Sequence, residues 1–162
     1  MPDPRWLTTD QQERWRSIIS VCALLPDRLD RDLAQGHQLS LAEYEVLVRL
    51  SESPRHSMRM SELADATLSS RSRLSHQITR MEKTGLVRRE ECFEDRRGWL
   101  AVMTDLGFTH LERAAPDHVE SVRRQLIDVL SPEEFEELGR ICGVIAHGLQ
   151  RTPQTDDASD CR

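Results

Sequence analysis

The feature that most limits the possible folds of this chain is a helical segment that ends at a glycine and leads into two short strands. The segment Ser70 to Thr84 is followed by Gly85, where a left-handed residue is expected to end the helix. Leu86 to Glu91 and Trp99 to Met103 have strand character and are joined by the polar tip Cys92 to Gly98. We therefore expect a helix beside a two-stranded hairpin, an arrangement that offers one element to the major groove of DNA and another to the adjacent minor groove.

A long helix is expected near the amino terminus. Thr9 is predicted as its N-cap, with Gln12 three residues later, and apolar residues then recur at helical spacing. Pro26 lies inside the segment and is predicted to bend or break the helix, because proline removes one backbone hydrogen bond. Gly36 is expected to end it.

Capping signals predict further helices. Ser40-Leu-Ala-Glu43 is a capping box, and a short helix from Met60 to Ala66 is expected after it. Thr104 can cap another long helix, in which Pro116 implies a kink or an interruption. Ser131-Pro-Glu-Glu134 combines a capping box with proline at the first helical position, so the last helix is expected to begin there.

Charge is distributed unevenly along the chain. The 162 residues carry a net charge of −6, but Arg55 to Gly98 contains ten Lys and Arg against seven Asp and Glu, a net charge of +3. The remainder therefore carries −9. A locally basic segment can hold DNA phosphates while an acidic remainder limits indiscriminate binding.

One side of the 70–84 helix is suited to DNA. Leu74, Ile78 and Met81 share a face that would anchor the helix, and the opposite face has no carboxylate. Arginine can bind the edge of guanine, and hydroxyl groups can bind bases or phosphates. The alternative is that this face is simply exposed to solvent and binds nothing. The residues expected to contact DNA from this segment are Ser69, Ser70, Arg71, Ser72, Arg73, Ser75, His76, Thr79, Arg80 and Lys83.

The hairpin tip Glu94-Asp95-Arg96-Arg97-Gly98 adds two cations. Arg96 and Arg97 are expected to meet the duplex backbone or to enter the minor groove, where the negative potential attracts arginine. Asp95 is interpreted as a brace that accepts the guanidinium of Arg97. An ordinary exposed loop is the alternative for this turn taken alone.

Taken together, these pieces resemble the MarR family of winged-helix transcription regulators. Met81 and Met103 replace the leucines that are more usual there, which are conservative changes. The resemblance is carried, in order, by Leu63-Ala64, the helix from Leu74 ending in Met81-Glu82-Lys83-Thr84-Gly85-Leu86-Val87-x-Arg89, the tip Asp95-x-Arg97, and Thr104-x-x-Gly107.

The resemblance implies a mainly α fold with a small β-hairpin wing, in which a winged helix-turn-helix lobe joins a dimerisation lobe. The expected parts are an N-terminal dimerisation helix (1–36), a DNA-binding lobe (40–104), C-terminal dimerisation helices (105–150) and a disordered tail (151–162). The first and last helices also carry apolar stripes that favour burial against a second copy, with packing inside one chain as the alternative.

The expected function is a homodimeric regulator, a repressor, that binds a near-palindromic operator in double-stranded DNA and is released by an unidentified small-molecule effector. A thiol-based redox regulator using Cys22 or Cys92 is the alternative, although Cys22 is expected to be buried on its apolar stripe and Cys92 to be more exposed. A winged helix that serves only protein interaction is a third hypothesis.

Several classes are not expected. The chain has no Walker loop, nucleophile elbow, dinucleotide-binding glycine motif or zinc-protease signature, so it is not expected to be an enzyme. The spacing of its four cysteines and six histidines predicts no metal site, and no cofactor is expected. No segment is apolar enough to span a membrane and the amino terminus lacks the features of a signal peptide, so a cytoplasmic location is expected.

Overall fold

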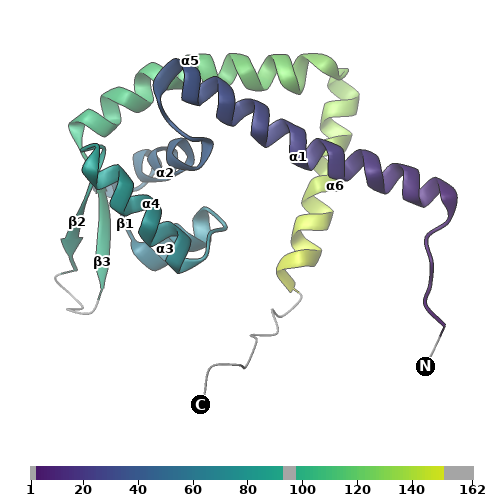
Figure 1. Cartoon of the computed structure of the whole chain (residues 1–162), viewed down its shortest axis with the longest axis horizontal. Coiled ribbons are helices and arrows are strands. Elements are labelled where there is room, and N and C mark those ends of the chain that lie inside the picture. Colours follow the sequence, from purple (N-terminus) through teal and green to yellow (C-terminus); the bar gives the residue numbers. More distant parts are fainter. Residues whose placement is uncertain (1–2, 93–97, 152–162) are drawn as a thin grey trace. The chain divides into compact units, whose positions relative to one another are not determined.

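The computed structural model describes residues 3–92 and 98–151, which divide into two compact units at Val122. The first unit holds most of the secondary structure and all of the strands found in the described residues (Figure 1). Its elements are α1 (Thr9–His37), α2 (Leu41–Glu52), the 3-10 helix η1 (Pro54–His56), β1 (Ser57–Arg59), α3 (Met60–Ala66), α4 (Arg71–Lys83), β2 (Val87–Glu91), β3 (Trp99–Met103) and most of α5 (Asp105–Gln125).

The predicted hairpin is confirmed and is part of a larger sheet. β2 pairs antiparallel with β3, from Val87 opposite Met103 to Glu91 opposite Trp99. The short strand β1 was not predicted; it pairs with the other edge of β3, which makes the order β1-β3-β2. We call β2, β3 and the connection between them the wing. The helices α3 and α4 pack beside it (Figure 1).

The predicted anchoring face of α4 forms part of the hydrophobic core. Leu74, Ile78 and Met81 are fully buried, and they share one cluster with side chains from α2, α3 and the sheet. Burial of such side chains contributes about 1.5–3 kcal/mol each. The inward face of α4 therefore anchors the helix in the core, and the other face is exposed to solvent.

The ends of the first helix differ slightly from the prediction. Thr8, and not Thr9, is the N-cap, and it forms a capping box with Gln11. The helix continues past Gly36 to His37 and ends at Gln38, which has a left-handed backbone (φ 56°). Pro26 does not interrupt the helix. α5 is likewise continuous through Pro116, so of the two outcomes predicted at each proline, a bend or a break, the break does not occur.

The junction between α4, the wing and α5 depends on a close backbone approach. Gly85 has φ 75°, as expected for a left-handed helix end. Thr104 caps α5 as predicted: its Oγ1 accepts the Gly107 N–H at 3.0 Å and donates to the Gly85 carbonyl at 2.6 Å. A Cβ on Gly107 would lie 2.1 Å from the carbonyl oxygen of Leu86, so only glycine fits there.

The second unit contains the end of α5, the 3-10 helix η2 (Ile127–Val129) and α6 (Pro132–Arg151). The predicted capping box is present, since the Ser131 N–H donates to Glu134 Oε2 at 2.8 Å and the Glu134 N–H donates to Ser131 Oγ at 3.2 Å. One face of α6 exposes large apolar side chains. None of the helices in the described residues has the length and hydropathy needed to cross a membrane.

Candidate nucleic-acid interface

The outer face of α4 is a polar surface without acidic side chains. Ser70 is the N-cap of the helix, and its Oγ accepts the N–H of Arg73 at 3.3 Å. Glu82 is the single carboxylate in α4, and it is half-buried beside β2. Apart from the half-buried Ser69, the residues predicted to contact DNA from this segment are all exposed: Ser70, Arg71, Ser72, Arg73, Ser75, His76, Thr79, Arg80 and Lys83.

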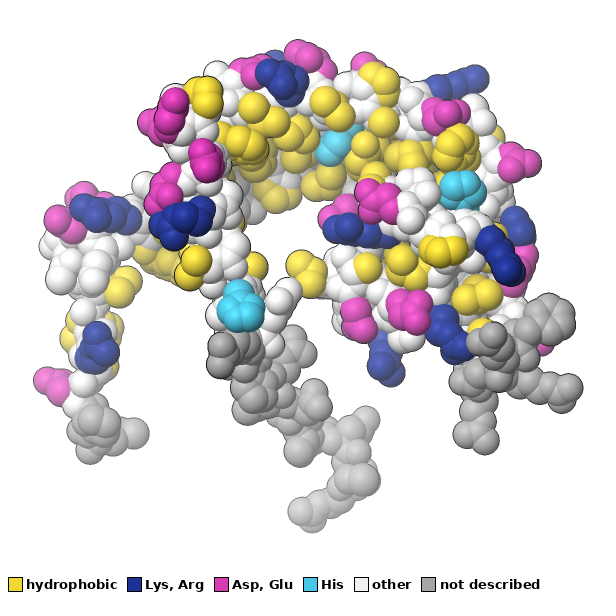
Figure 2. Space-filling view, turned by 180° about the vertical axis from the view of Figure 1, so that it is seen from behind, with side chains coloured by type: hydrophobic (Ala, Val, Ile, Leu, Met, Phe, Trp, Pro, Cys, Tyr) yellow, Lys and Arg dark blue, Asp and Glu magenta, His cyan; other side chains and the backbone are white. Residues whose placement is uncertain are grey.

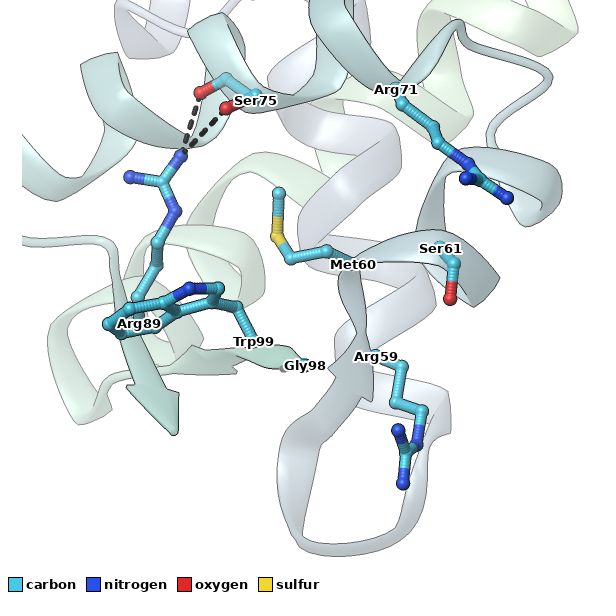
Figure 3. A pocket seen from close by; sticks show the side chains of 8 residues that line it. All are labelled: Arg59, Met60, Ser61, Arg71, Ser75, Arg89, Gly98 and Trp99. Atoms are coloured by element: carbon cyan, nitrogen blue, oxygen red, sulfur yellow. Dashed lines mark hydrogen bonds between the residues drawn. The ribbon is translucent and has the colours of Figure 1, made fainter. Parts of the chain in front are cut away.

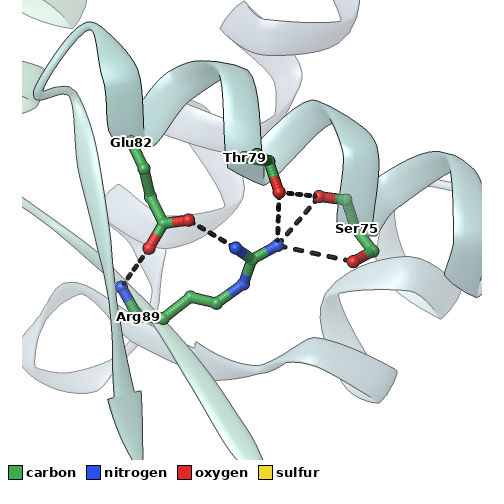
Figure 4. Close-up of polar contacts among 4 residues, drawn as sticks. All are labelled: Ser75, Thr79, Glu82 and Arg89. Atoms are coloured by element: carbon green, nitrogen blue, oxygen red, sulfur yellow. Dashed lines mark hydrogen bonds and ion pairs between the residues drawn. The ribbon is translucent and has the colours of Figure 1, made fainter.

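A guanidinium from the wing strand binds the side of α4. The backbone N–H of Arg89 donates to Glu82 Oε1 at 3.0 Å, and its Nη1 donates to Glu82 Oε2 (Figure 4). Its Nη2 donates to the Ser75 carbonyl at 2.8 Å and to Thr79 Oγ1 at 3.1 Å. The Arg89 side chain thus joins β2 to two successive turns of α4.

This network limits what two of the predicted contact residues can offer. The hydroxyl of Thr79 donates to the Ser75 carbonyl at 2.9 Å and accepts from Arg89, so its hydrogen is already used. Ser75 Oγ also accepts from Arg89, at 3.4 Å. Arg73, His76 and Arg80 have no part in this network and are the better candidates for reading bases.

A pocket of about 300 Å³ lies between the start of α3, α4 and the wing (Figure 3). Arg59 and Arg71 lie on one side of it and Trp99 and Arg89 on the other, with the Arg89 guanidinium directed to Ser75. Arg59 and Arg71 bring positive charge to this opening, which favours an anion such as a backbone phosphate, whereas the Arg89 guanidinium is already paired with Glu82. The lining residues are Arg59, Met60, Ser61, Arg71, Ser75, Arg89, Gly98 and Trp99.

The remaining predicted residues are at the hairpin tip. Asp95, Arg96 and Arg97 lie outside the described residues, so the brace between Asp95 and Arg97 stays a prediction. At the described base of the wing, Arg88 pairs with Glu90 at 2.7 Å on the exposed surface. Such an exposed pair contributes little to stability.

The region where α1, α2 and α5 meet is held by aromatic and polar contacts. The rings of Tyr44 and His118 pack with their centroids 4.3 Å apart. Burial raises the pKa of Tyr44 and lowers the pKa of His118, so both groups are neutral near pH 7. His37 Nε2 lies 2.8 Å from Asp117 Oδ2, which ties the end of α1 to α5.

Comparison with known proteins places this geometry in a family. A model of the MarR family matches residues 39–98. The HTH-type transcriptional regulator PecS of Dickeya dadantii (strain 3937) is 31% identical over 120 residues, which span 74% of this chain and 70% of PecS. The chain belongs to the MarR family.

Solved structures of MarR-family transcriptional regulators agree with this assignment. Sco3205 from Streptomyces coelicolor, whose crystal structure is in complex with DNA, is 47% identical, with a TM-score of 0.89 over 94% of this chain and 95% of Sco3205. AbsC from the same organism is 51% identical, with a TM-score of 0.86 over 91% and 99% of the two chains. The mainly helical winged-helix fold predicted from the sequence is thereby confirmed.

In this MarR-family chain, the burial of Cys22 and Cys92 is the reverse of what the sequence predicted. Cys92 is buried, with 6% of its surface exposed, and its N–H donates to the Gly98 carbonyl at 2.9 Å, so the strand pairing continues past β2. Cys22 is exposed on α1 in the single chain, where burial was predicted. Within the first unit, the described residues leave the apolar stripe that holds Cys22 uncovered.

Proposed function

We propose that this protein is a sequence-specific DNA-binding transcriptional regulator that binds a near-palindromic operator as a homodimer. The observation that carries the proposal is the exposed outer face of α4, which presents Arg73, His76, Arg80 and Lys83 without a carboxylate, next to the wing. The similarity of the chain to Sco3205, whose crystal structure is in complex with DNA, supports DNA as the partner of this protein too.

Physical chemistry favours a duplex over other partners for this face. The N-terminal end of α4 has partial positive charge, and Ser70, Arg71, Ser72 and Arg73 stand at that end. Arginine can bind guanine O6 and N7 with two hydrogen bonds, while lysine and hydroxyl groups bind phosphate. We therefore assign base reading to α4 and minor-groove or backbone contact to Arg96 and Arg97 of the wing.

The homodimer is supported by apolar side chains that α1 exposes within the first unit and α6 exposes within the second. Large exposed apolar patches usually mark a surface that binds another protein. Figure 2 shows one face of the molecule, on which hydrophobic side chains (yellow) lie among charged ones. The exposed large apolar residues are Trp15, Ile18, Ile19, Val21 and Leu24 on α1, and Phe135, Leu138, Ile141, Val144, Ile145 and Leu149 on α6.

We further propose that the regulator represses transcription by occluding a promoter and that a small-molecule effector releases it. The support is the family resemblance, and no effector chemistry follows from the residues. A screen for compounds that release the protein from its operator tests this part. Activation of a reporter gene by the protein, with no compound causing release, would contradict it.

Selection of bound sequences from random duplexes tests the DNA-binding proposal. A symmetric dimer is expected to enrich an inverted repeat whose half-sites are centred about 10 base pairs, or a multiple of this, apart. Enrichment of no common sequence would contradict sequence-specific binding.

Substitutions on α4 and on the wing are expected to have different effects. Arg73→Ala or His76→Ala should alter the preference among operator sequences, with a cost of about 1–3 kcal/mol at a base that the side chain reads. Arg97→Ala should weaken binding to all sequences more evenly and reduce the slope of log affinity against log salt by about one. Titrations of operator variants at several salt concentrations measure both; identical profiles would contradict the division of roles.

Redox sensing is a second candidate function, because Cys22 is exposed on α1 in the single chain, among the apolar residues that the proposed homodimer covers, so that its oxidation would act on the interface. If Cys22 is the switch, peroxide should lower the operator affinity of the wild-type protein but not that of Cys22→Ser. Cys92→Ser serves as the control, because the buried Cys92 thiol is poorly accessible. Unchanged binding by the oxidised wild-type protein would remove this candidate.

A further inference from the structure

The side chain of Arg89 makes a connection that the DNA-binding proposal does not explain. Its guanidinium reaches Glu82 near the end of α4 and Ser75 seven residues earlier (Figure 4). Seven residues span about 10 Å of a helix axis. A single side chain of the wing strand therefore bonds to groups that lie about half the length of α4 apart.

We propose that Arg89 is a positioning residue that fixes the angle of α4 relative to the wing strand β2, so that helix and wing engage the same duplex together. This inference rests on the DNA binding proposed above. In this proposal Arg89 affects DNA binding by holding α4 in place, and it does not itself contact the bases.

The chemistry of the contacts suits this role. Hydrogen bonds between a guanidinium and a carboxylate are short, directional and stronger than neutral ones, and arginine presents several donors in a fixed plane. The side chains of Arg89 and Glu82 are only 21% and 30% exposed, so solvent competes weakly with the pair. The backbone N–H of Arg89 also donates to Glu82, so the strand itself, and not only its side chain, is tied to the helix.

The alternative is that Arg89 simply adds positive charge to the pocket that it lines together with Arg59 and Arg71. The two roles predict opposite signs when Glu82 is neutralised. If charge alone matters, Glu82→Gln removes a nearby negative charge and strengthens DNA binding. If Arg89 positions α4, the same substitution weakens operator binding, because Arg89 loses its charged partner.

The first test compares Glu82→Gln with Glu62→Gln by titration of a fluorescent operator duplex. Glu62 is an exposed carboxylate on α3 that is not among the groups bonded to Arg89, so its substitution changes the net charge equally. We expect Glu82→Gln to lower operator affinity about tenfold without changing the salt slope. Glu62→Gln should bind as tightly as the wild-type protein or slightly more tightly.

Arg89→Lys provides a second, independent variant. Lysine keeps the charge but cannot reach Glu82, Ser75 and Thr79 at once from one planar group. Operator affinity should fall, while affinity for a scrambled duplex should stay the same because that binding depends on charge. Thermal unfolding of both variants shows that they are folded at the assay temperature; if Arg89→Lys is not, Glu82→Gln carries the test.

The outcomes separate the two proposals. A wild-type protein that does not distinguish operator from scrambled duplex contradicts the proposed function. A wild-type protein that is specific, with a Glu82→Gln variant of equal or higher operator affinity, overturns the positioning role of Arg89 alone.

Discussion

Replacing Ile145 with glutamate is expected to convert the proposed homodimer to a monomer and to lower operator affinity by about a hundredfold or more, because a monomer can engage only one half-site. Ile145 lies on the apolar face of α6 and is 51% exposed in the single chain. In a symmetric interface each substitution occurs twice, and an unpaired carboxylate in an apolar contact is strongly unfavourable. Sedimentation velocity measures the oligomeric state, and titration of the full operator measures the affinity.

His147→Glu is the matched control for this prediction. His147 is on the same helix two residues further along, about 200° around its axis, and so on the other side from Ile145. This variant should remain a dimer and bind the operator normally. A dimeric Ile145→Glu protein would show that the apolar face of α6 is not the interface.

Gly107→Ala is expected to destabilise the fold by about 3 kcal/mol, the upper end of the cost of overpacking a core. The new Cβ would lie 2.1 Å from the Leu86 carbonyl oxygen and 3.1 Å from Met103 Cγ. Backbone is the obstacle on one side, so either α5 or the turn after α4 must move. For a protein of this size the melting temperature should fall by roughly 6–12 °C.

Gly139→Ala is the control for a glycine that is not constrained in this way. It lies in α6 with no atom within 4 Å of an added Cβ, so alanine should leave stability unchanged or raise it by up to about 1 kcal/mol. Thermal unfolding of the two variants under identical conditions makes the comparison. Equal melting temperatures would contradict the tight approach of α5 to Leu86.

Local signals explain why much of the fold could be predicted. The spacing of Leu74, Ile78 and Met81 predicts which face of α4 is buried, and Gly85 marks the end of that helix, because both features act within a few residues. The capping boxes at Ser40 and Ser131 were also predicted correctly.

The missed features depend on contacts between distant residues. β1 has only three residues, and its partner β3 lies more than 40 positions later, so no local pattern indicates it. Arg89 resembles an exposed strand residue until the fold brings it to Ser75, 14 residues away. Cys92 was expected to be exposed because it lies at the wing beside Arg88 and Arg89, but it is buried, and its backbone pairs with Gly98 across the hairpin.

The central claim, that the outer face of α4 and the wing recognise a specific duplex, is tested most directly by one comparison. The wild-type protein is titrated at physiological salt with the operator obtained by selection and with a scrambled duplex of the same composition. The account predicts that the operator binds at least about a thousandfold more tightly. Equal affinity for the two duplexes would contradict it.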